Sequence, residues 1–519
     1  MLIFIWGCEK TKAKLKINGI DDSVYSELDY TKSVLDSTQI NAFFIANRTF
    51  QNVREPLIDF YKRRAFQYAW FNQDGLIDAT FTFYSQLQLF SDDFGDKSLI
   101  NPKLDSLLVL FHSNEEQLRN DKSSVLNLEL LLTASFFQYS DKVYGGTAKN
   151  TLDLEWFIPR KKKNYQVLLD SLVSATSSQL YEPQNQYYKP LKAKLSEYRS
   201  IEKKGGFPKI NCAKKIILLG DEDSCLINVK KYLLLTGDLK SADSSATFDD
   251  SLQMAVLRFQ HRMGLKETGK INQETIVELS QPIEFRIKQM MVNLERLRWI
   301  PEVLENDYLL VNIPAYKLHI FESGKHHWVT NVVVGQQVKQ TTIFKGNISQ
   351  IILNPYWGIP KSIVVNEILP KIKRNRHYLS QNNIEIINGN YRQKPGKKNA
   401  LGEIKFLFPN HFNIYLHDTP SKRLFDETKR AFSHGCIRVE NPKLVALWLL
   451  RKNTDWNEQK MVKILKTDTE TSINLKPTVP IYIAYFTAWV ESNGELNFRN
   501  DLYNLDDKLA KEIFALNDK

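Results

Sequence analysis

The stretch that surrounds the fourth cysteine constrains the fold most, because it predicts two strands, a tight turn and a helix in a fixed order. Residues 412–416 have the composition of a strand and end at His417, and residues 437–439 alternate apolar and polar side chains as a half-buried strand does. Asn441 and Pro442 then provide a favourable N-cap and first position for an apolar helix. The side chains between the strands are therefore expected in the mouth of a loop.

Cys436 stands in that loop directly after Gly435, with one histidine before the loop and one beside the glycine. A thiol becomes a strong nucleophile as the thiolate, and a nearby imidazole that takes or shares its proton lowers its apparent pKa. Gly435 permits a tight turn in which main-chain N–H groups can point at a developing oxyanion. Most buried cysteines act as small hydrophobic residues. Cys436 alone has this setting, so we predict it as the nucleophile, with His417 and His434 as candidates for the base.

The segment resembles the L,D-transpeptidases of the YkuD type, whose signature is an upstream histidine, then Ser/Thr-His-Gly-Cys and a downstream arginine. It is most similar to their large YcbB-like members. Residues 415–422, 430–433 and 354–357 carry that similarity, and the resemblance covers roughly residues 215–519. The resemblance implies an acyltransferase with a cysteine nucleophile that acts on peptidoglycan stem peptides.

The resemblance also helps to assign the base. In the YcbB-like members the residue before Gly-Cys is not always histidine, so we favour His417 as the general base and acid and expect His434 to be a supporting group. Asp418 would orient the His417 imidazole, through either its peptide carbonyl or its side chain. Gly435 is expected to provide a backbone donor of the oxyanion hole.

Four further residues are expected to bind substrate. Arg438 presents a planar fork of donors that suits a carboxylate, and the stem peptides implied by the resemblance carry carboxylates. Ser433 is expected to form hydrogen bonds in the pocket. Tyr415 and Trp357 are expected in the pocket walls, although aromatic residues are more often part of a core.

Metal and nucleic-acid chemistry fit the sequence poorly. His417, His434 and Cys436 could supply three zinc ligands, but the second and third are two residues apart and the chain lacks Cys-x-x-Cys and His-Glu-x-x-His patterns. We therefore expect no metal and no cofactor. The net charge of +11 is modest for 519 residues and suits an approach to anionic wall polymers, and no nucleic-acid motif is present.

A second pattern, before the catalytic segment, predicts a pair of helices. Apolar residues recur at i, i+3, i+4 and i+7 of the first helix, at Leu252, Ala255, Val256 and Phe259. Gly264 ends this helix, and Asn272 caps a second one. The pattern is similar to the small helical peptidoglycan-binding domain.

Together these signals predict a multidomain α+β chain: a helical N-terminal scaffold, a small helical peptidoglycan-binding domain, and a β-rich mixed-sheet sandwich with a capping insertion. A run of leucines at 126–132 predicts a buried helix in the scaffold. The expected boundaries are 1–8 for a truncated lipoprotein signal, 9–215 for the scaffold, 216–282 for the binding domain, 283–305 for a connecting helix, 306–470 for the catalytic domain with the insertion at about 361–412, and 471–519 for a C-terminal extension that packs on the catalytic domain.

The other cysteines bear on location. Cys8 follows an apolar start and precedes charged residues, which resembles the end of a lipoprotein signal with Cys8 as the acylated residue. The alternative is an incidental apolar terminus. We expect an exported protein of the periplasm or cell envelope, in which Cys212 and Cys225 could form a disulfide.

The resemblance thus implies a peptidoglycan L,D-transpeptidase that forms 3→3 cross-links between donor and acceptor stem peptides through a cysteinyl thioester. It also implies inactivation by carbapenem β-lactams. Two alternatives remain. One is a cysteine L,D-carboxypeptidase or endopeptidase with water as the acceptor, and the other is a non-catalytic wall-binding scaffold.

Overall fold

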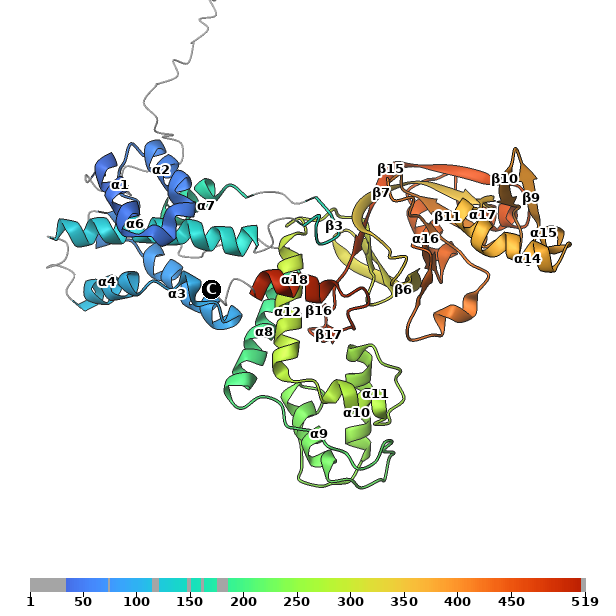
Figure 1. Cartoon of the computed structure of the whole chain (residues 1–519), viewed down its shortest axis with the longest axis horizontal. Helices are drawn as coiled ribbons and strands as arrows, with labels where there is room; N and C mark the ends of the chain where they lie inside the picture. The colour runs from blue at the N-terminus through green and yellow to red at the C-terminus, as the bar shows by residue number, and fades with distance from the viewer. Residues whose placement is uncertain are drawn as a thin grey trace, which may run out of the picture. The chain divides into compact units, whose positions relative to one another are not determined.

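The computed structural model forms two compact units (Figure 1). It describes residues 34–72, 75–113, 121–146, 151–159, 163–174 and 185–514, so the predicted signal at 1–8 and Cys8 lie outside the described residues. The first unit comprises Met1–Gly146 with Lys162–Pro183, and the second comprises Thr147–Lys161 with Gln184–Lys519.

The first unit is helical and is built around one buried helix, α6. The leucine run at 126–132 lies in α6, and most of the helix from Leu128 onward is buried, as the sequence predicts. The elements of this unit are α1 (Ser37–Ala46), η2 (Arg48–Val53), α2 (Arg54–Arg63), β1 (Phe71–Asn72), β2 (Gly75–Leu76), α3 (Ala79–Phe94), η3 (Lys97–Leu99), α4 (Pro102–Ser113), α6 (Lys122–Ser140), η4 (Asp141–Gly145) and α7 (Tyr165–Ser174).

A buried carboxylate ties α6 to the segment that follows α2. Glu129 Oε1 accepts hydrogen bonds from Tyr61 Oη at 2.7 Å and from the peptide N–H of Ala69 at 2.6 Å, and Oε2 accepts from the Trp70 N–H at 3.0 Å. Burial raises the pKa of Glu129. These three donors offset the cost of placing a carboxylate in an apolar core.

In the described part of the second unit, five helices lie between β3 (Trp156–Phe157) and β4 (Tyr308–Asn312). They are α8 (Tyr188–Lys203), α9 (Cys225–Leu235), α10 (Asp250–Met263), α11 (Gln273–Leu279) and α12 (Ile283–Arg298). A disulfide joins Cys212 to Cys225 at the start of α9. Helix α12 occupies most of the predicted connecting segment and packs along α8.

The predicted helix pair is α10 and α11. The four apolar positions of α10 that the sequence singles out are buried, and Gly264 ends the helix with a φ of +66°. Asn272 caps α11 by accepting a hydrogen bond from the Thr275 N–H at 2.9 Å. Both predicted helix ends are confirmed.

A ten-stranded mixed sheet follows, in the order β11-β12-β14-β6-β5-β4-β15-β7-β3, with β13 paired to β6. Strand β11 also pairs with β7, so the path closes on itself. The branched and aromatic residues that favour strands supply its interior, and Val333, Ile351 and Phe406 are fully buried. The strands are β3 (Trp156–Phe157), β4 (Tyr308–Asn312), β5 (Lys317–Glu322), β6 (Lys325–Gly335), β7 (Ile343–Leu353), β11 (Ile404–Leu407), β12 (Leu416–His417), β13 (Ala431–Ser433), β14 (Ile437–Val439) and β15 (Thr471–Ala484).

The segment that the sequence assigns to an extension, residues 471–519, contains an internal strand of this sheet. Strand β15 lies between β4 and β7, parallel to the first and antiparallel to the second. Its apolar residues are buried on the sheet, with Ile481 and Ile483 fully covered. We therefore propose that the sheet domain extends to the end of β15.

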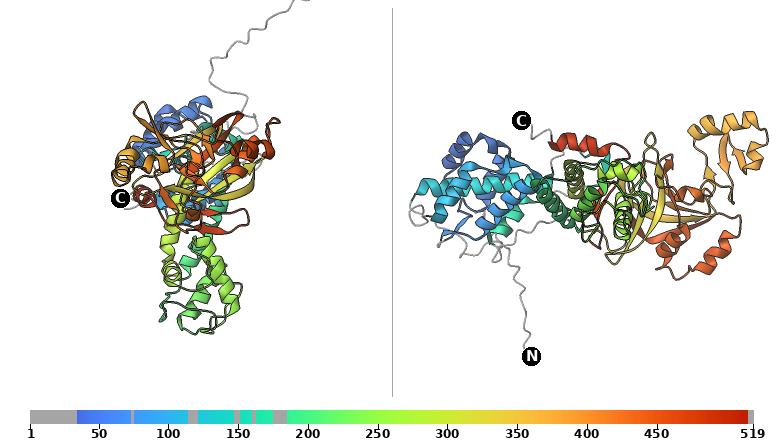
Figure 2. Two further views of the ribbon diagram at one scale, coloured as in Figure 1. Left: turned by 90° about the vertical axis from the view of Figure 1, so that its right-hand side faces the viewer. Right: turned by 90° about the horizontal axis from the view of Figure 1, so that it is seen from below.

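The capping insertion is a lobe with its own small core beside the sheet (gold in Figure 2). Its three-stranded sheet has the order β8-β10-β9. It therefore starts at β8, slightly before the predicted 361, whereas β11 within the predicted range belongs to the large sheet. Its elements are β8 (Trp357–Gly358), α13 (Lys361–Ile363), η5 (Val364–Ile368), α14 (Leu369–Arg374), α15 (Tyr378–Gln381), β9 (Ile384–Ile387) and β10 (Asn390–Gln393).

The remaining elements are η6 (Lys422–Phe425), α16 (Pro442–Leu450), α17 (Glu458–Leu465), β16 (Ala488–Val490), β17 (Leu496–Phe498) and α18 (Leu505–Phe514). Pro442 is the first residue of α16, as predicted. Asn441 occupies the cap position, but its amide donates to Thr330 Oγ1 at 3.1 Å instead of capping the helix.

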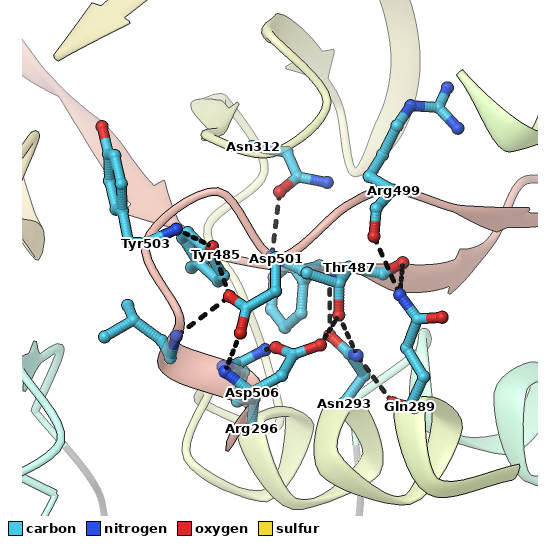
Figure 3. A network of polar contacts seen from close by, with 12 residues as sticks. Gln289, Asn293, Arg296, Asn312, Tyr485, Thr487, Arg499, Asp501, Tyr503 and Asp506 are labelled. Carbon is cyan, nitrogen blue, oxygen red and sulfur yellow. Dashed lines mark hydrogen bonds and ion pairs between the residues drawn. The ribbon is translucent and has the colours of Figure 1, made fainter. Parts of the chain in front are cut away.

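A buried polar network joins α12 to the turn after β15 and to α18 (Figure 3). Asn293 Nδ2 donates to Thr487 Oγ1 at 2.7 Å, and the Thr487 hydroxyl donates to Asp506 Oδ2 at 2.6 Å. Arg296 Nη1 lies 2.5 Å from Asp506 Oδ1. These contacts fix the C-terminal segment on α12.

The multidomain α+β class is confirmed, with a helical N-terminal region and a β-rich C-terminal part. In the part of the chain that the structure describes, no helix combines the length and apolar character needed to cross a bilayer.

Candidate active site

The pairing of β12 with β14 gathers the predicted residues on one face of the sheet. The two strands are parallel, with His417 opposite Arg438, and the Ile437 N–H donates to the Tyr415 carbonyl at 3.1 Å. Alternate residues of a strand share a face, and so do residues directly opposite in a pair. Tyr415, His417, Cys436 and Arg438 therefore project on the same side.

The strand before His417 is shorter than the sequence predicts. Strand β12 has only two residues, because the preceding backbone bonds to a side chain in place of a neighbouring strand. Asn410 Oδ1 accepts from the N–H groups of Phe412 and Ile414, at 3.0 and 3.1 Å. Asn413, between them, has a φ of +55°. This turn brings the Asn413 carbonyl next to the thiol.

The orientation of His417 is fixed by the main chain of its neighbour. His417 Nδ1 lies 2.5 Å from the Asp418 carbonyl oxygen, which can only accept, so Nδ1 carries the proton and Nε2 keeps its lone pair. The Asp418 carboxylate is engaged elsewhere, with Lys422 Nζ at 2.7 Å and the Glu403 N–H at 2.9 Å. Of the two routes that the sequence leaves open, the carbonyl thus holds the imidazole.

The His417 imidazole is neutral in this environment. Its side chain is buried, and burial together with the positive charge of Arg438 lowers its pKa to about 3. A second cation, Lys405, acts in the same direction. At neutral pH the imidazole is therefore uncharged and able to accept a proton at Nε2.

The thiol of Cys436 is partly buried, and burial raises its pKa. Hydrogen bonds from Tyr415 and the charges of Lys405 and Arg438 oppose that rise by favouring the thiolate. Sγ lies 3.7 Å from the Asn413 carbonyl oxygen. Within residues 185–514, no hydrogen bond joins Sγ to either candidate imidazole. The resting pair is therefore a neutral thiol and a neutral imidazole, not an ion pair.

The turn before Cys436 is held by its own residues. Gly435 has a φ of +113°, which favours glycine. The buried Ser433 hydroxyl donates to the Cys436 carbonyl at 2.5 Å and accepts from the Gly435 N–H at 3.1 Å. The Gly435 N–H is thus engaged within the turn, and Ser433 stabilises that turn through both of these bonds. In the described part of the second unit, the Cys436 N–H has no acceptor.

His434 joins the turn to the capping insertion. Its imidazole is exposed, and Nε2 lies 3.2 Å from Glu367 Oε1 in η5. Trp357 of β8 also reaches the site from the insertion, since its side chain slightly opposes the rise that burial causes in the pKa of Tyr415. The insertion thus meets two of the predicted site residues: its Glu367 pairs with His434, and its Trp357 lies beside Tyr415.

Two cations, Arg438 and Lys405, lie beside the thiol, and the charge of each favours the thiolate. In the described range 185–514, neither Arg438 nor Lys405 forms an ion pair, and Arg438 Nε is buried without a hydrogen-bond acceptor. Lys405 stands opposite His417 in the β11–β12 pair, with Nζ 4.1 Å from the centroid of the Tyr415 ring. The sequence reasoning missed Lys405. Its signal is a lysine between two buried apolar residues of a short strand, Ile404 and Phe406.

Comparison with known families assigns parts of this chain. Residues 306–464 match the model of the L,D-transpeptidase catalytic domain, and residues 55–195 match a scaffold domain. Residues 226–279 match a model described as "Putative peptidoglycan binding domain". A Haemophilus influenzae protein named "Putative L,D-transpeptidase" is 32% identical over 240 residues, which cover 42% of this chain and 48% of that protein. The match thus spans about half the length of that relative.

Two solved structures of L,D-transpeptidases match parts of this chain. An L,D-transpeptidase from Stackebrandtia nassauensis has a TM-score of 0.22 and 13% identity, and covers 54% of this chain and 96% of its own. One from Xylanimonas cellulosilytica has a TM-score of 0.20 and 13% identity, and covers 52% of this chain and 98% of its own.

Proposed function

Because the chain carries an L,D-transpeptidase catalytic domain and a peptidoglycan-binding domain, we propose that it forms 3→3 cross-links between peptidoglycan stem peptides through a cysteinyl thioester. The observation that carries the proposal is the pair of a partly buried thiol and a neutral imidazole whose Nδ1 proton is held by a peptide carbonyl. This arrangement suits acyl transfer by a thiol.

In the first step, Cys436 Sγ attacks the carbonyl carbon of the third residue of a tetrapeptide stem. The thiol proton moves to His417 Nε2, since both groups are neutral at rest. The oxyanion of the tetrahedral intermediate accepts a hydrogen bond from the Cys436 N–H. The C–N bond then breaks, His417 returns the proton to the leaving amine, and D-alanine departs from a thioester.

In the second step, an amine of a neighbouring stem attacks the thioester carbonyl. His417 accepts the amine proton and returns it to sulfur as the C–S bond breaks, so the thiol is regenerated. Arg438 and Lys405 would bind a substrate carboxylate, because they are two half-buried cations that form no ion pair among residues 185–514. Such a carboxylate would also lessen their lowering effect on the His417 pKa.

Hydrolysis is the competing outcome, with water in place of the acceptor amine. The contacts of the capping insertion with the site, at His434 and Trp357, favour transfer, because a covered thioester is less exposed to water. A non-catalytic scaffold is disfavoured, since a nucleophile, a base and a free backbone donor stand together.

The test is incubation of purified disaccharide-tetrapeptides with the full chain, followed by liquid chromatography and mass spectrometry. Transfer yields a dimer with the mass of two monomers minus one alanine. Hydrolysis yields a tripeptide and free alanine. Cys436→Ala is the matched control and should give neither product. Unchanged monomers with the wild-type protein, together with a Cys436 thiol that imipenem does not acylate, would contradict the proposed function.

We also propose export to the cell envelope, which the predicted peptidoglycan substrate requires. Cys8 remains the proposed lipidation site. Metabolic labelling with an alkyne fatty acid, comparing wild type with Cys8→Ala, tests this directly. Equal labelling of the two proteins would count against the anchor.

A further inference from the structure

The peptide unit between Gly435 and Cys436 carries two groups that point in opposite directions. A trans peptide is planar, so its C=O and N–H are antiparallel. Whatever holds the Gly435 carbonyl therefore also sets the direction of the Cys436 N–H. This N–H is the donor that the described part of the second unit leaves without an acceptor.

Thr341 holds that carbonyl. Its hydroxyl donates to the Gly435 oxygen at 2.8 Å and accepts from the Gly335 N–H at 2.9 Å, so both of its roles are used. The side chain is 1% exposed. Gly335 must be glycine here, because a Cβ at this position would lie 2.2 Å from the Lys339 carbonyl. Thr341 is thus fixed against the end of β6.

Tyr503 contacts both Thr341 and Gly335. Its hydroxyl donates to the Gly335 carbonyl at 2.7 Å and accepts from the Thr341 N–H at 3.2 Å. Its own N–H donates to Tyr485 Oη at 2.8 Å, and the Tyr485 hydroxyl donates to Asp501 Oδ1 at 2.6 Å (Figure 3). Tyr503 is buried, so water does not compete for these bonds.

This cluster is anchored in the core. Asp501 Oδ2 accepts from the Asp506 N–H at 2.8 Å, and the Asp506 carboxylate pairs with Arg296 of α12. An unbroken series of hydrogen bonds thus runs from α12 to the Gly435 carbonyl. A series of satisfied, buried bonds is rigid, and rigidity is what a preorganised oxyanion donor requires.

We propose that Thr341 and Tyr503 are positioning residues, which orient the Cys436 N–H toward the oxyanion of the acyl-transfer intermediate. They touch neither the thiol nor the substrate and act through the Gly435–Cys436 peptide. The inference rests on the proposed function, since it assigns these residues to the oxyanion of that reaction.

The experiment compares two reactions of the Cys436 thiol, one that forms an oxyanion and one that does not. Acylation of Cys436 by imipenem passes through an oxyanion, whereas alkylation by iodoacetamide does not. Both rates are measured on the full chain by intact mass. Thr341→Val keeps the branched shape and removes the hydroxyl, and Thr341→Ser restores it. Thr330→Val is the matched control, because it removes a buried threonine hydroxyl that bonds only to Asn441 among the described residues.

Removing a direct oxyanion donor costs about 10²- to 10³-fold in rate, so misorienting one should cost about 10- to 100-fold. Thr341→Val is expected to lose this factor in acylation, while its alkylation rate and pH profile stay within about twofold. Thr341→Ser and Thr330→Val should acylate as the wild type does. Equal acylation by Thr341→Val and wild type would overturn the inference.

Tyr503→Phe is the second variant, and it tests the positioning role if Thr341→Val does not fold. It leaves the Thr341 hydroxyl in place and removes its support, so a loss of about three- to tenfold in acylation alone is expected. A wild-type rate for folded Tyr503→Phe would then overturn the inference. Failure of imipenem to acylate the wild type would instead refute the proposed function.

Discussion

A histidine whose pKa lies far below its ordinary value should keep the enzyme active in acid. Burial and the charge of Arg438 lower the pKa of His417 from 6.5 to about 3. The difference of about 3.5 pH units corresponds to about 5 kcal/mol in favour of the neutral ring. At pH 4.5 an ordinary histidine would be about 1% neutral, whereas His417 should remain about 97% neutral.

The assay is the second-order rate of acylation by imipenem from pH 7.5 to 4.5, followed by intact mass and corrected for spontaneous hydrolysis of the antibiotic. We expect the rate to change less than threefold over this range, against about a hundredfold for an ordinary histidine base. His434→Gln is the control. Its imidazole is exposed and paired with Glu367, so its removal should leave the profile unchanged. A half-maximal rate between pH 6 and 7 in the wild type would refute the reasoning.

The same pKa has a consequence for stability. The folded pKa lies below the unfolded one, so the unfolded chain binds the proton first as the pH falls below 6.5. The free energy of unfolding should then decrease by about 1.4 kcal/mol per pH unit until about pH 3. His417→Gln removes this contribution. Hydrogen exchange of peptides from 404–439 at pH 7 and 5 should show about 2 kcal/mol less acid destabilisation in the variant than in the wild type. Equal destabilisation would contradict the neutral, buried ring.

Three more results are expected. Arg438→Gln should raise the KM for tetrapeptide stems about ten- to hundredfold with a smaller change in kcat, because a charge-assisted hydrogen bond contributes about 1.5–3 kcal/mol; an unchanged KM would exclude Arg438 from carboxylate binding. Gly435→Ala should slow acylation, because a residue with a Cβ pays about 1–3 kcal/mol to adopt the φ of +113°. A wild-type acylation rate would show that the turn tolerates a side chain. Glu129→Ala leaves the buried peptide N–H groups of Ala69 and Trp70 without a partner and should destabilise the first unit by about 2 kcal/mol or more in urea, while imipenem acylation of the folded protein stays unchanged.

The sequence predicts best those elements whose local pattern agrees with their final environment. Helices α10 and α11 follow from the spacing of apolar residues and from Gly264 and Asn272, and all of these signals are local. The β14 strand and the start of α16 at Pro442 are equally local. The Gly435 turn likewise follows from one residue type. The prediction of these elements requires no long-range contact.

Other features depend on side-chain contacts that composition and periodicity do not reveal. The β12 strand is short because the Asn410 side chain satisfies the preceding backbone, which composition does not reveal. Lys405 becomes part of the site only when β11 pairs with β12. From the sequence, the carboxylate and the peptide carbonyl of Asp418 are equal candidates for orienting His417. In the structure the carboxylate bonds to Lys422, so the carbonyl takes this role. Each of these outcomes depends on a hydrogen bond or strand pairing that forms only in the folded chain.

The position of β15 has a consequence for how the chain matures. This strand lies between β4 and β7, yet it follows the nucleophile by more than thirty residues, and Tyr503 comes later still. Until β15 has been made, the sheet has a gap between β4 and β7. The sulfur can therefore reach its working geometry only after β15 has been made, and a nascent chain stalled before residue 484 should not react with imipenem.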